Sequence, residues 1–307
     1  MGTVEFLSDT ISPIKIQYDQ VVTRFDHEHG ISWIEMRPEG VPCCTQELLS
    51  ELHRYNRSIE NSGGKIQVGN ELHHIHYSVV SSLIPGAFNL GGHLGLFSQL
   101  IKNKDGESLL NYSMKCLDVI FSRVNHYNLP LTTISLVQGD ALGGGLEAAL
   151  SSDIIIAERS AKMGFPEVLF NLIPGHGAFS MVARKIGVTH AEKMILNGKI
   201  YSAEELLEMG LVDILVEDGM GDVAVYDYVE KQARRSNAFM ALKKARQRFN
   251  PITYKEMLDI TNIWVDSALK LSEKDIKVMD RFARSQQRLF GEVDNPLATK
   301  KNLALSA

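Results

Sequence analysis

The stretch from residue 137 to residue 180 constrains this chain of 307 residues most, because it combines a run of three glycines with two isolated carboxylates. Gly143, Gly144 and Gly145 lead directly into a helix-like run, 146–150. Glycine lets a backbone approach a ligand closely, and the first N–H groups of a helix have no partner within the helix. The pattern therefore predicts a site for a developing oxyanion at this turn.

Two glutamates accompany the glycine turn. Glu147 lies in the first turn of the helix-like run, and Glu167 follows twenty residues later, after the apolar run 154–157. The residues around both are mostly apolar, which argues against a solvated face. Two carboxyls can act as base and acid, so both are candidate catalytic residues. The alternative is a pair of surface or helix-terminal glutamates, which the helix dipole also favours.

A second glycine pair, Gly91 and Gly92, stands in the segment FNLGGHL and also precedes a helix-like run, 96–101. An oxyanion hole needs two N–H donors that converge on one oxygen, and two glycine turns can supply one donor each. The residues alone leave open whether the two glycine-rich segments form one such site or two unrelated turns.

Composition and charge limit the classes of function that this chain can have. With 44% hydrophobic and 22% charged residues the chain reads as an ordinary globular protein, and its net charge of −5 argues against nucleic acid as the main partner. No apolar run is long enough to span a bilayer, and the N-terminus lacks the basic and apolar blocks of a signal peptide. Cys43, Cys44 and Cys116 are too few and badly spaced for a disulfide framework or a zinc site. We therefore expect a cytoplasmic protein without a membrane-bound part.

Strands that alternate with helices predict an α/β core. Beyond residue 220 the pattern is helical throughout, with helix-start signals at Asn250-Pro251 and at Ser272 with Asp275. We place a boundary there, between an α/β catalytic core, 1–220, and a helical C-terminal extension, 221–307. Within the core, Ser202 and Glu205 match a capping box, and residues 211–216 read as a short strand.

Five further residues have side chains that could bind a metal or a substrate. His73, His74 and His76 lie in residues 72–80, which read as one strand, so His74 and His76 would share a face. No carboxylate or cysteine completes the set at a spacing typical of a metal site. We therefore favour ordinary polar side chains on a strand over metal ligands. His176, between two glycines in IPGHGAF, could touch a substrate or be an incidental loop residue. Asp153 reads as a turn or helix-end residue.

A basic run occupies residues 231–248 and contains no acidic residue. Its members are Lys231, Arg234, Arg235, Lys243, Lys244, Arg246 and Arg248. A solvated helix face is the usual meaning of such a run. In a chain of net charge −5 it is also a candidate docking surface for an acidic partner.

Taken together, these residues resemble the crotonase (enoyl-CoA hydratase/isomerase) superfamily across roughly residues 20–220. The matching segments are FNLGGHL, QGDALGGGLEAALSSDIIIA, MGFPEVLFNLIPGHGAFSMVARKIG and ILNGKIYSAEELLEMGLVDILV. The resemblance implies a spiral α/β core of repeated β-β-α units. It also implies catalysis without a metal or redox cofactor, on an acyl thioester substrate.

The resemblance assigns roles by position. Gly92 and Gly144 would donate the two oxyanion N–H groups. Beside them we expect Gly91, Gly143 and His176 as further substrate contacts. Glu147 and Glu167 match the acid/base pair of the hydratases. For loss of a hydroxyl group we assign Glu167 as the base and Glu147 as the acid, in roles that the two could share.

Within the superfamily the chain is most similar to the diffusible signal factor synthases, through MRPEGVPCCTQELLSEL, PGAFNLGGHLGLF and DRFARSQQR. This similarity implies a bacterial lyase and thioesterase of quorum sensing. Such an enzyme dehydrates a 3-hydroxyacyl chain on acyl carrier protein and then releases a cis-2-unsaturated fatty acid signal. It further implies a homotrimer or a dimer of trimers built with the C-terminal helices.

Acyl carrier proteins are strongly acidic, which makes the basic run a candidate dock through Arg234, Arg235, Lys243 and Lys244. In FNLGGHL, Gly92 and His93 replace the Ala-Asp that hydratases often show, which favours a carrier protein over coenzyme A as the carrier. Two alternatives stay open. One is an enoyl-CoA hydratase that does not hydrolyse the thioester, and the other is a non-catalytic scaffold that binds a regulatory sensor protein.

Overall fold

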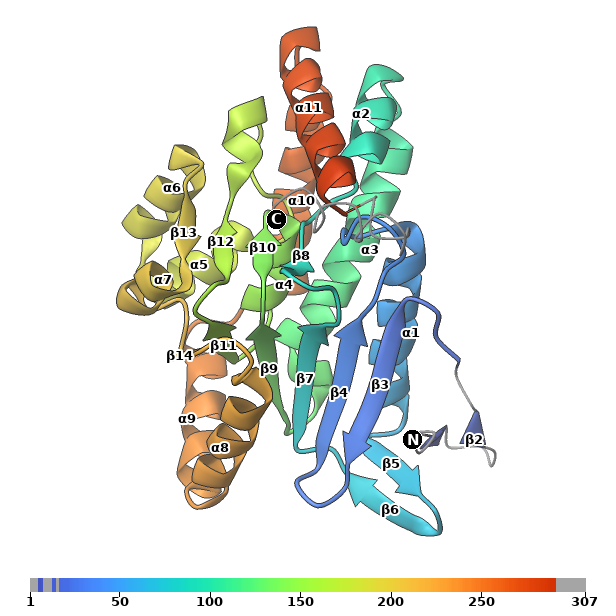
Figure 1. The fold of residues 1–307 in the computed structure, drawn as a ribbon, viewed down its shortest axis with the longest axis vertical. Helices are drawn as coiled ribbons and strands as arrows, with labels where there is room; N and C mark the ends of the chain where they lie inside the picture. The colour runs from blue at the N-terminus through green and yellow to red at the C-terminus, as the bar shows by residue number, and fades with distance from the viewer. Residues whose placement is uncertain (1–4, 8–12, 15–16, 291–307) are drawn as a thin grey trace, which may run out of the picture.

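A six-stranded sheet forms the centre of the fold, in the order β14-β11-β9-β7-β4-β3 (Figure 1). The computed structural model describes residues 5–7, 13–14 and 17–290 of the chain. Neighbouring strands are parallel except in the β3–β4 hairpin. All six residues of β9 are buried, as expected for a parallel strand covered on both faces. The strands are β3 (Val21–Asp26), β4 (Ile31–Met36), β7 (Tyr77–Ser82), β9 (Thr132–Val137), β11 (Ile154–Glu158) and β14 (Ile214–Val216).

A smaller sheet, ordered β13-β12-β10-β8, lies past the C-terminal ends of β7, β9 and β11 (Figure 1). Its strands are β8 (Ala87–Asn89), β10 (Asp140–Leu142), β12 (Lys162–Gly164) and β13 (Ile200–Ser202). Each of β8, β10 and β12 follows directly on a strand of the large sheet, β7, β9 and β11, and helical structure comes next along the chain. The chain thus repeats a β-β-α unit, which confirms the predicted crotonase-type core.

Helices cover both faces of the large sheet. On one face α1 (Gln46–Asn61) packs against α3 (Gly106–Val124) over the larger hydrophobic core. On the other face α8 (Gly221–Ala233) packs on β9 and β11, and its Val225 and Val229 belong to a second hydrophobic cluster with Trp33 and Ile134. The remaining helices of this part are α2 (Leu94–Lys102), η1 (His126–Asn128), α4 (Gly144–Leu150), η2 (Pro166–Phe170), α5 (Ala178–Ile186), α6 (Val188–Asn197) and α7 (Ala203–Met209).

The described residues beyond 220 are helical apart from short connections. After α8 come α9 (Ser236–Phe249), α10 (Tyr254–Ala268) and α11 (Glu273–Phe290). α10 packs on α3, and α11 packs on α2 and η2, so both lie on the core (Figure 1). No helix among residues 17–290 is long and apolar enough to cross a membrane. The first residues of the predicted core, 1–4, and the last residues of the predicted C-terminal extension, 291–307, lie outside the described residues.

The predicted strand 72–80 is wrong, because the chain changes sheets within it. β6 (Glu71–His74) pairs with β5 (Lys65–Val68) in a third sheet that also contains β1 (Glu5–Leu7) and β2 (Pro13–Ile14). The backbone N–H groups of His76 and Tyr77 then both donate to the carbonyl of Gly30, where β7 begins. The predicted strand 211–216 is likewise shorter, starting at Ile214. The capping box of Ser202 and Glu205 is confirmed.

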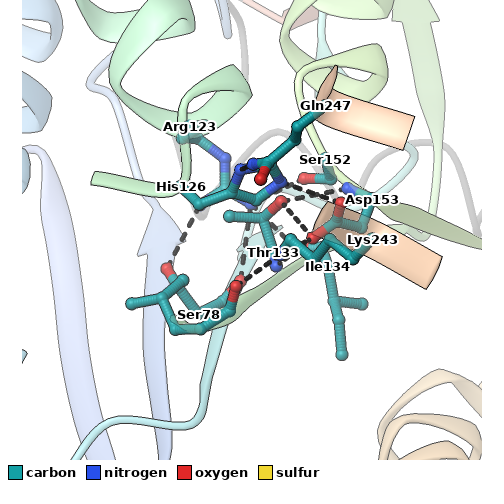
Figure 2. Close-up of polar contacts among 10 residues, drawn as sticks. Ser78, Arg123, His126, Thr133, Ile134, Ser152, Asp153, Lys243 and Gln247 are labelled. Atoms are coloured by element: carbon teal, nitrogen blue, oxygen red, sulfur yellow. Dashed lines mark hydrogen bonds and ion pairs between the residues drawn. The ribbon is translucent and has the colours of Figure 1, made fainter. Parts of the chain in front are cut away.

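A buried polar network fixes α9 on the core (Figure 2). Lys243 of α9 is 7% exposed, and its ammonium lies 2.5 Å from Asp153 Oδ2. Asp153 also contacts His126 Nε2 at 2.8 Å and accepts from the backbone N–H of Thr133 at 3.1 Å. Burial opposes ionisation of Asp153, but the bond to His126 and the charge of Lys243 outweigh it and hold the pKa of Asp153 well below its usual range. Asp153 stands in a bend, as predicted, yet it also neutralises a buried lysine.

Removal of one partner from this pair should strongly destabilise the fold. We expect Asp153→Ala to lower the free energy of unfolding by about 3–5 kcal/mol, because Lys243 would be left as a buried, unpaired charge. Urea unfolding followed by circular dichroism measures the change. Asp259→Ala is the matched control, since its ion pair with Lys255 is exposed and such pairs contribute less than about 1 kcal/mol. Equal losses in the two variants would contradict a structural role for the Asp153 pair.

Candidate active site

A cavity of about 270 Å³ lies between the small sheet, α4 and the C-terminal helices. Most of the predicted site residues line it: Gly92, Gly143, Gly144, Glu147, Glu167 and His176. The rest of the wall is largely apolar and includes Leu90, Phe97, Leu142, Leu169, Phe170, Leu172, Trp264 and Phe282. An apolar hollow with a few polar groups is the usual form of a small-molecule binding site.

The two glycine turns lie in contact, which the sequence left open. β8 and β10 are parallel neighbours, so the turns that follow them meet at the same edge. A Cβ atom placed on Gly144 would lie 3.3 Å from Cα of Gly91 and 3.4 Å from the backbone nitrogen of Gly92. Gly91 has φ of +86°, a conformation that favours glycine. The structure thus brings the two candidate oxyanion turns together as one unit.

Three contacts fix these turns. A Cβ on Gly145 would lie 1.8 Å from the carbonyl oxygen of Asn89, so only glycine lets α4 approach β8 so closely. The side-chain oxygen of Asn89 accepts from the backbone N–H of Gly91 at 2.8 Å. The ring of Phe97 occupies the position that a side chain on Gly92 would need, 2.4 Å from its ideal Cβ. The glycines therefore serve close packing as well as access to the cavity.

Glu147 is not a surface residue, since it is 1% exposed. Its Oε1 accepts the backbone N–H groups of His176 at 2.7 Å and Ala178 at 3.0 Å. Its Oε2 lies 3.4 Å from Nδ1 of His176. These contacts hold the carboxyl against the loop that precedes α5, on the wall of the cavity.

Glu167, in η2, faces the same cavity with a different environment. Its Oε2 is buried and has no hydrogen-bond partner among the described residues. Burial, followed by the nearby charge of Glu147, raises the pKa of Glu167 to about 8. The carboxyl lies against Gly143, where a Cβ would come within 2.3 Å of Oε1. Glu167 is therefore mostly protonated at neutral pH, and its pKa lies in the range where a carboxyl can both give up and accept a proton.

The structure corrects one member of the predicted dock. Lys243 is buried and bound to Asp153, so it is not available to a partner protein. Arg234, Arg235 and Lys244 are exposed on the α8–α9 hairpin. Figure 1 shows this hairpin at the opposite end of the molecule from α11.

Sequence reasoning missed the contribution of the C-terminal helices to the cavity. Trp264 of α10 and Phe282 of α11 line it, and Gln286 of α11 donates to the carbonyl of Leu90 at 3.3 Å. Both aromatic residues stand at ordinary apolar positions of amphipathic helices, so no local pattern distinguishes them from core residues. Only the packing of these helices on α2, α3 and η2 brings them to the site.

The family model described as Enoyl-CoA hydratase/isomerase matches residues 73–288. The mitochondrial methylglutaconyl-CoA hydratases of Mus musculus and Homo sapiens are 32% identical to the chain over 148 residues. That stretch covers 48% of this chain and 45% and 42% of the two relatives, so the chain spans less than half the length of these relatives.

Solved structures share the fold. The enoyl-CoA hydratase of Bacillus halodurans superposes with a TM-score of 0.71 at 22% identity, covering 85% of this chain and 98% of that one. Pseudomonas aeruginosa DspI superposes with a TM-score of 0.62 at 24% identity, covering 86% and 95%. At these identities the likeness concerns the fold alone.

The raised pKa of Glu167 predicts a pH-dependent stability effect. In the unfolded chain this carboxyl ionises near its ordinary value of 4.5, whereas in the fold it stays protonated to about 8. Wild-type protein should therefore lose stability as the pH rises from 4.5 to 8, and Glu167→Gln should not lose that part. The gain in melting temperature of the variant should be small at pH 5 and should level off above pH 8. A gain that does not vary with pH, or one shared by the exposed Glu192→Gln, would contradict the buried carboxyl.

Proposed function

Because the chain belongs to the enoyl-CoA hydratase/isomerase family, within the crotonase superfamily, we propose that its cavity adds water to or removes it from acyl thioesters. One observation carries the proposal: Glu147 and Glu167 both line an apolar cavity beside two contacting glycine turns. An apolar wall suits an acyl chain, and paired carboxyls suit proton transfer at its C2 and C3 atoms.

The proposed mechanism follows from this geometry. The thioester oxygen binds the N–H groups of Gly92 and Gly144, which stabilise the enolate that forms when C2 loses its proton. Glu167 takes that proton, and Glu147 gives a proton to the hydroxyl group that leaves C3 as water. Dehydration starts with Glu167 ionised and the proton on Glu147, whereas the raised pKa of Glu167 favours its protonated form. Hydration runs the same steps backwards from the protonated form.

We further propose that the substrate is a 3-hydroxyacyl chain on acyl carrier protein and that the thioester is then hydrolysed. The product would be a cis-2-unsaturated fatty acid of the diffusible signal factor type. The motifs around 36–52, 85–97 and 280–288 support this, and the fold shared with Pseudomonas aeruginosa DspI agrees with it. Hydrolysis needs no second oxyanion site, since water attacks the same carbonyl.

A second candidate function is hydration of an enoyl-CoA without hydrolysis. The names of the Mus musculus and Homo sapiens relatives favour it, since both are methylglutaconyl-CoA hydratases. Mass spectrometry after incubation with 3-hydroxyacyl carrier protein separates the two: a free unsaturated acid supports hydrolysis, and an enoyl thioester alone supports the hydratase. The buried carboxyls of Glu147 and Glu167 argue against the third alternative, a non-catalytic scaffold that binds a sensor protein.

Partners are proposed from the surface of α9. Leu242 is 62% exposed and Phe249 is 88% exposed, which supports a self-association surface such as that of the expected homotrimer or dimer of trimers. Arg234, Arg235 and Lys244 remain the proposed dock for an acidic carrier protein, without Lys243.

Replacement of either carboxyl should impair catalysis without unfolding the protein. We expect Glu147→Gln and Glu167→Gln each to lower kcat by about 10²–10⁴, because a glutamine cannot transfer the proton. Steady-state dehydration of a 3-hydroxyacyl thioester measures the loss, and Glu192→Gln on the exposed side of α6 is the matched control. A folded Glu147 or Glu167 variant with near-normal turnover would remove that residue from the mechanism.

The dock predicts a loss that depends on the carrier. Arg234, Arg235 and Lys244 changed together to glutamate should raise KM for carrier-bound substrate, and the effect should shrink as salt rises. Turnover of a small pantetheine thioester should change little, since it needs no protein contact. The control changes three exposed lysines elsewhere, Lys115, Lys193 and Lys274, by the same total charge. Equal loss on both substrates, with a smaller particle on a sizing column, would instead indicate a subunit interface.

A further inference from the structure

His176 carries a polar atom that the proposed mechanism does not use. Among the described residues, two of the buried side-chain atoms without a hydrogen-bond partner belong to residues that line the cavity: Oε2 of Glu167 and Nε2 of His176. A buried polar atom left unpaired costs free energy, so such atoms in a cavity wall indicate where a ligand supplies the missing partner. Glu167 already has a role in proton transfer, whereas His176 Nε2 has none.

The ring of His176 is held from several sides. Its Nδ1 lies 3.4 Å from Glu147 Oε2, and its backbone N–H donates to Glu147 Oε1. The ring of Trp264 packs on it with a centroid separation of 5.5 Å. Because His176 is only 5% exposed, its ring is enclosed rather than free in a surface loop.

The loop that carries His176 is also fixed to α10. Thr261 donates from its hydroxyl to the carbonyl of Gly175 at 2.9 Å. A Cβ on Gly175 would lie 2.3 Å from the Trp264 ring, so glycine allows the helix to pack directly on the loop. The position of the His176 ring in the cavity wall is therefore set by the scaffold before any ligand binds.

We propose that His176 Nε2 hydrogen-bonds the 3-hydroxyl group of the acyl chain and makes the cavity selective for 3-hydroxyacyl over saturated acyl thioesters. This inference rests on the proposed function, which places an acyl thioester there. The hydroxyl at C3 is the polar group that separates the two kinds of chain. A hydroxyl both donates and accepts, so it pairs with either tautomer of the ring, and its second lone pair stays free for the proton from the acid.

Two variants distinguish the contribution of Nε2 from that of Nδ1. An asparagine amide reaches about as far as Nδ1, so His176→Asn keeps a polar group toward Glu147 and removes the one at Nε2. A glutamine amide reaches about as far as Nε2, so His176→Gln keeps the group that meets the hydroxyl. Titration calorimetry would compare two ligands, amide analogues of pantetheine thioesters with a 3-hydroxyacyl or a saturated chain of equal length.

Wild-type protein should bind the hydroxylated analogue about 10-fold to 100-fold more tightly, the size of one buried hydrogen bond. The Asn variant should lose most of this ratio, and the Gln variant should retain part of it. Because the ratio is measured within each protein, a general loss of stability does not mimic the result. Thermal unfolding of both variants checks that they are folded.

Four outcomes would overturn the inference. An Asn variant with the wild-type ratio would show that Nε2 does not contact the hydroxyl. Equal weakening of both analogues in both variants would show that His176 only supports the cavity wall. Wild-type protein that dehydrates 3-hydroxyacyl thioesters yet shows no preference would overturn the role of His176 alone, whereas wild-type protein that binds neither analogue would overturn the proposed function as well.

Discussion

The parallel pairing of β8 with β10 is the contact on which the candidate site depends. It places the turn of Gly91 and Gly92 against the turn that starts α4, at a separation that leaves no room for side chains. The closeness of Gly145 to the Asn89 carbonyl shows how little tolerance this contact has. The cavity, the two carboxyls and the loop of His176 are all arranged around it.

The protein stabilises buried charge in two different ways. Asp153 and Lys243 neutralise each other and gain further contacts from His126 and Thr133, so both can be ionised inside the fold. Glu167 has no such partner and lies near another carboxyl, so the fold holds it mostly as a neutral acid. The first arrangement supports structure, and the second keeps a proton available at the expense of stability.

Local sequence patterns predicted the features that depend on local chemistry. The glycine turns, the two glutamates and the cap at Ser202 follow from residue type and spacing, and the structure brings both glycine turns and both glutamates to one place. The strand 72–80 was wrong because a change of sheet leaves no trace in apolar periodicity. The docking role of Lys243 was wrong because a charge run does not reveal which lysine turns inward. The aromatic residues of α10 and α11 were missed because their role exists only in the tertiary structure.

The last described helix completes the cavity wall, since Phe282 lines it and Gln286 binds the Leu90 carbonyl. Synthesis proceeds from the N-terminus at about 5–20 residues per second. The β-β-α units therefore emerge from the ribosome well before α11. A partly synthesised chain thus already contains both glutamates while its cavity still lacks one side. The proposed active site is therefore completed late in translation, after the two glutamates to which we assign proton transfer.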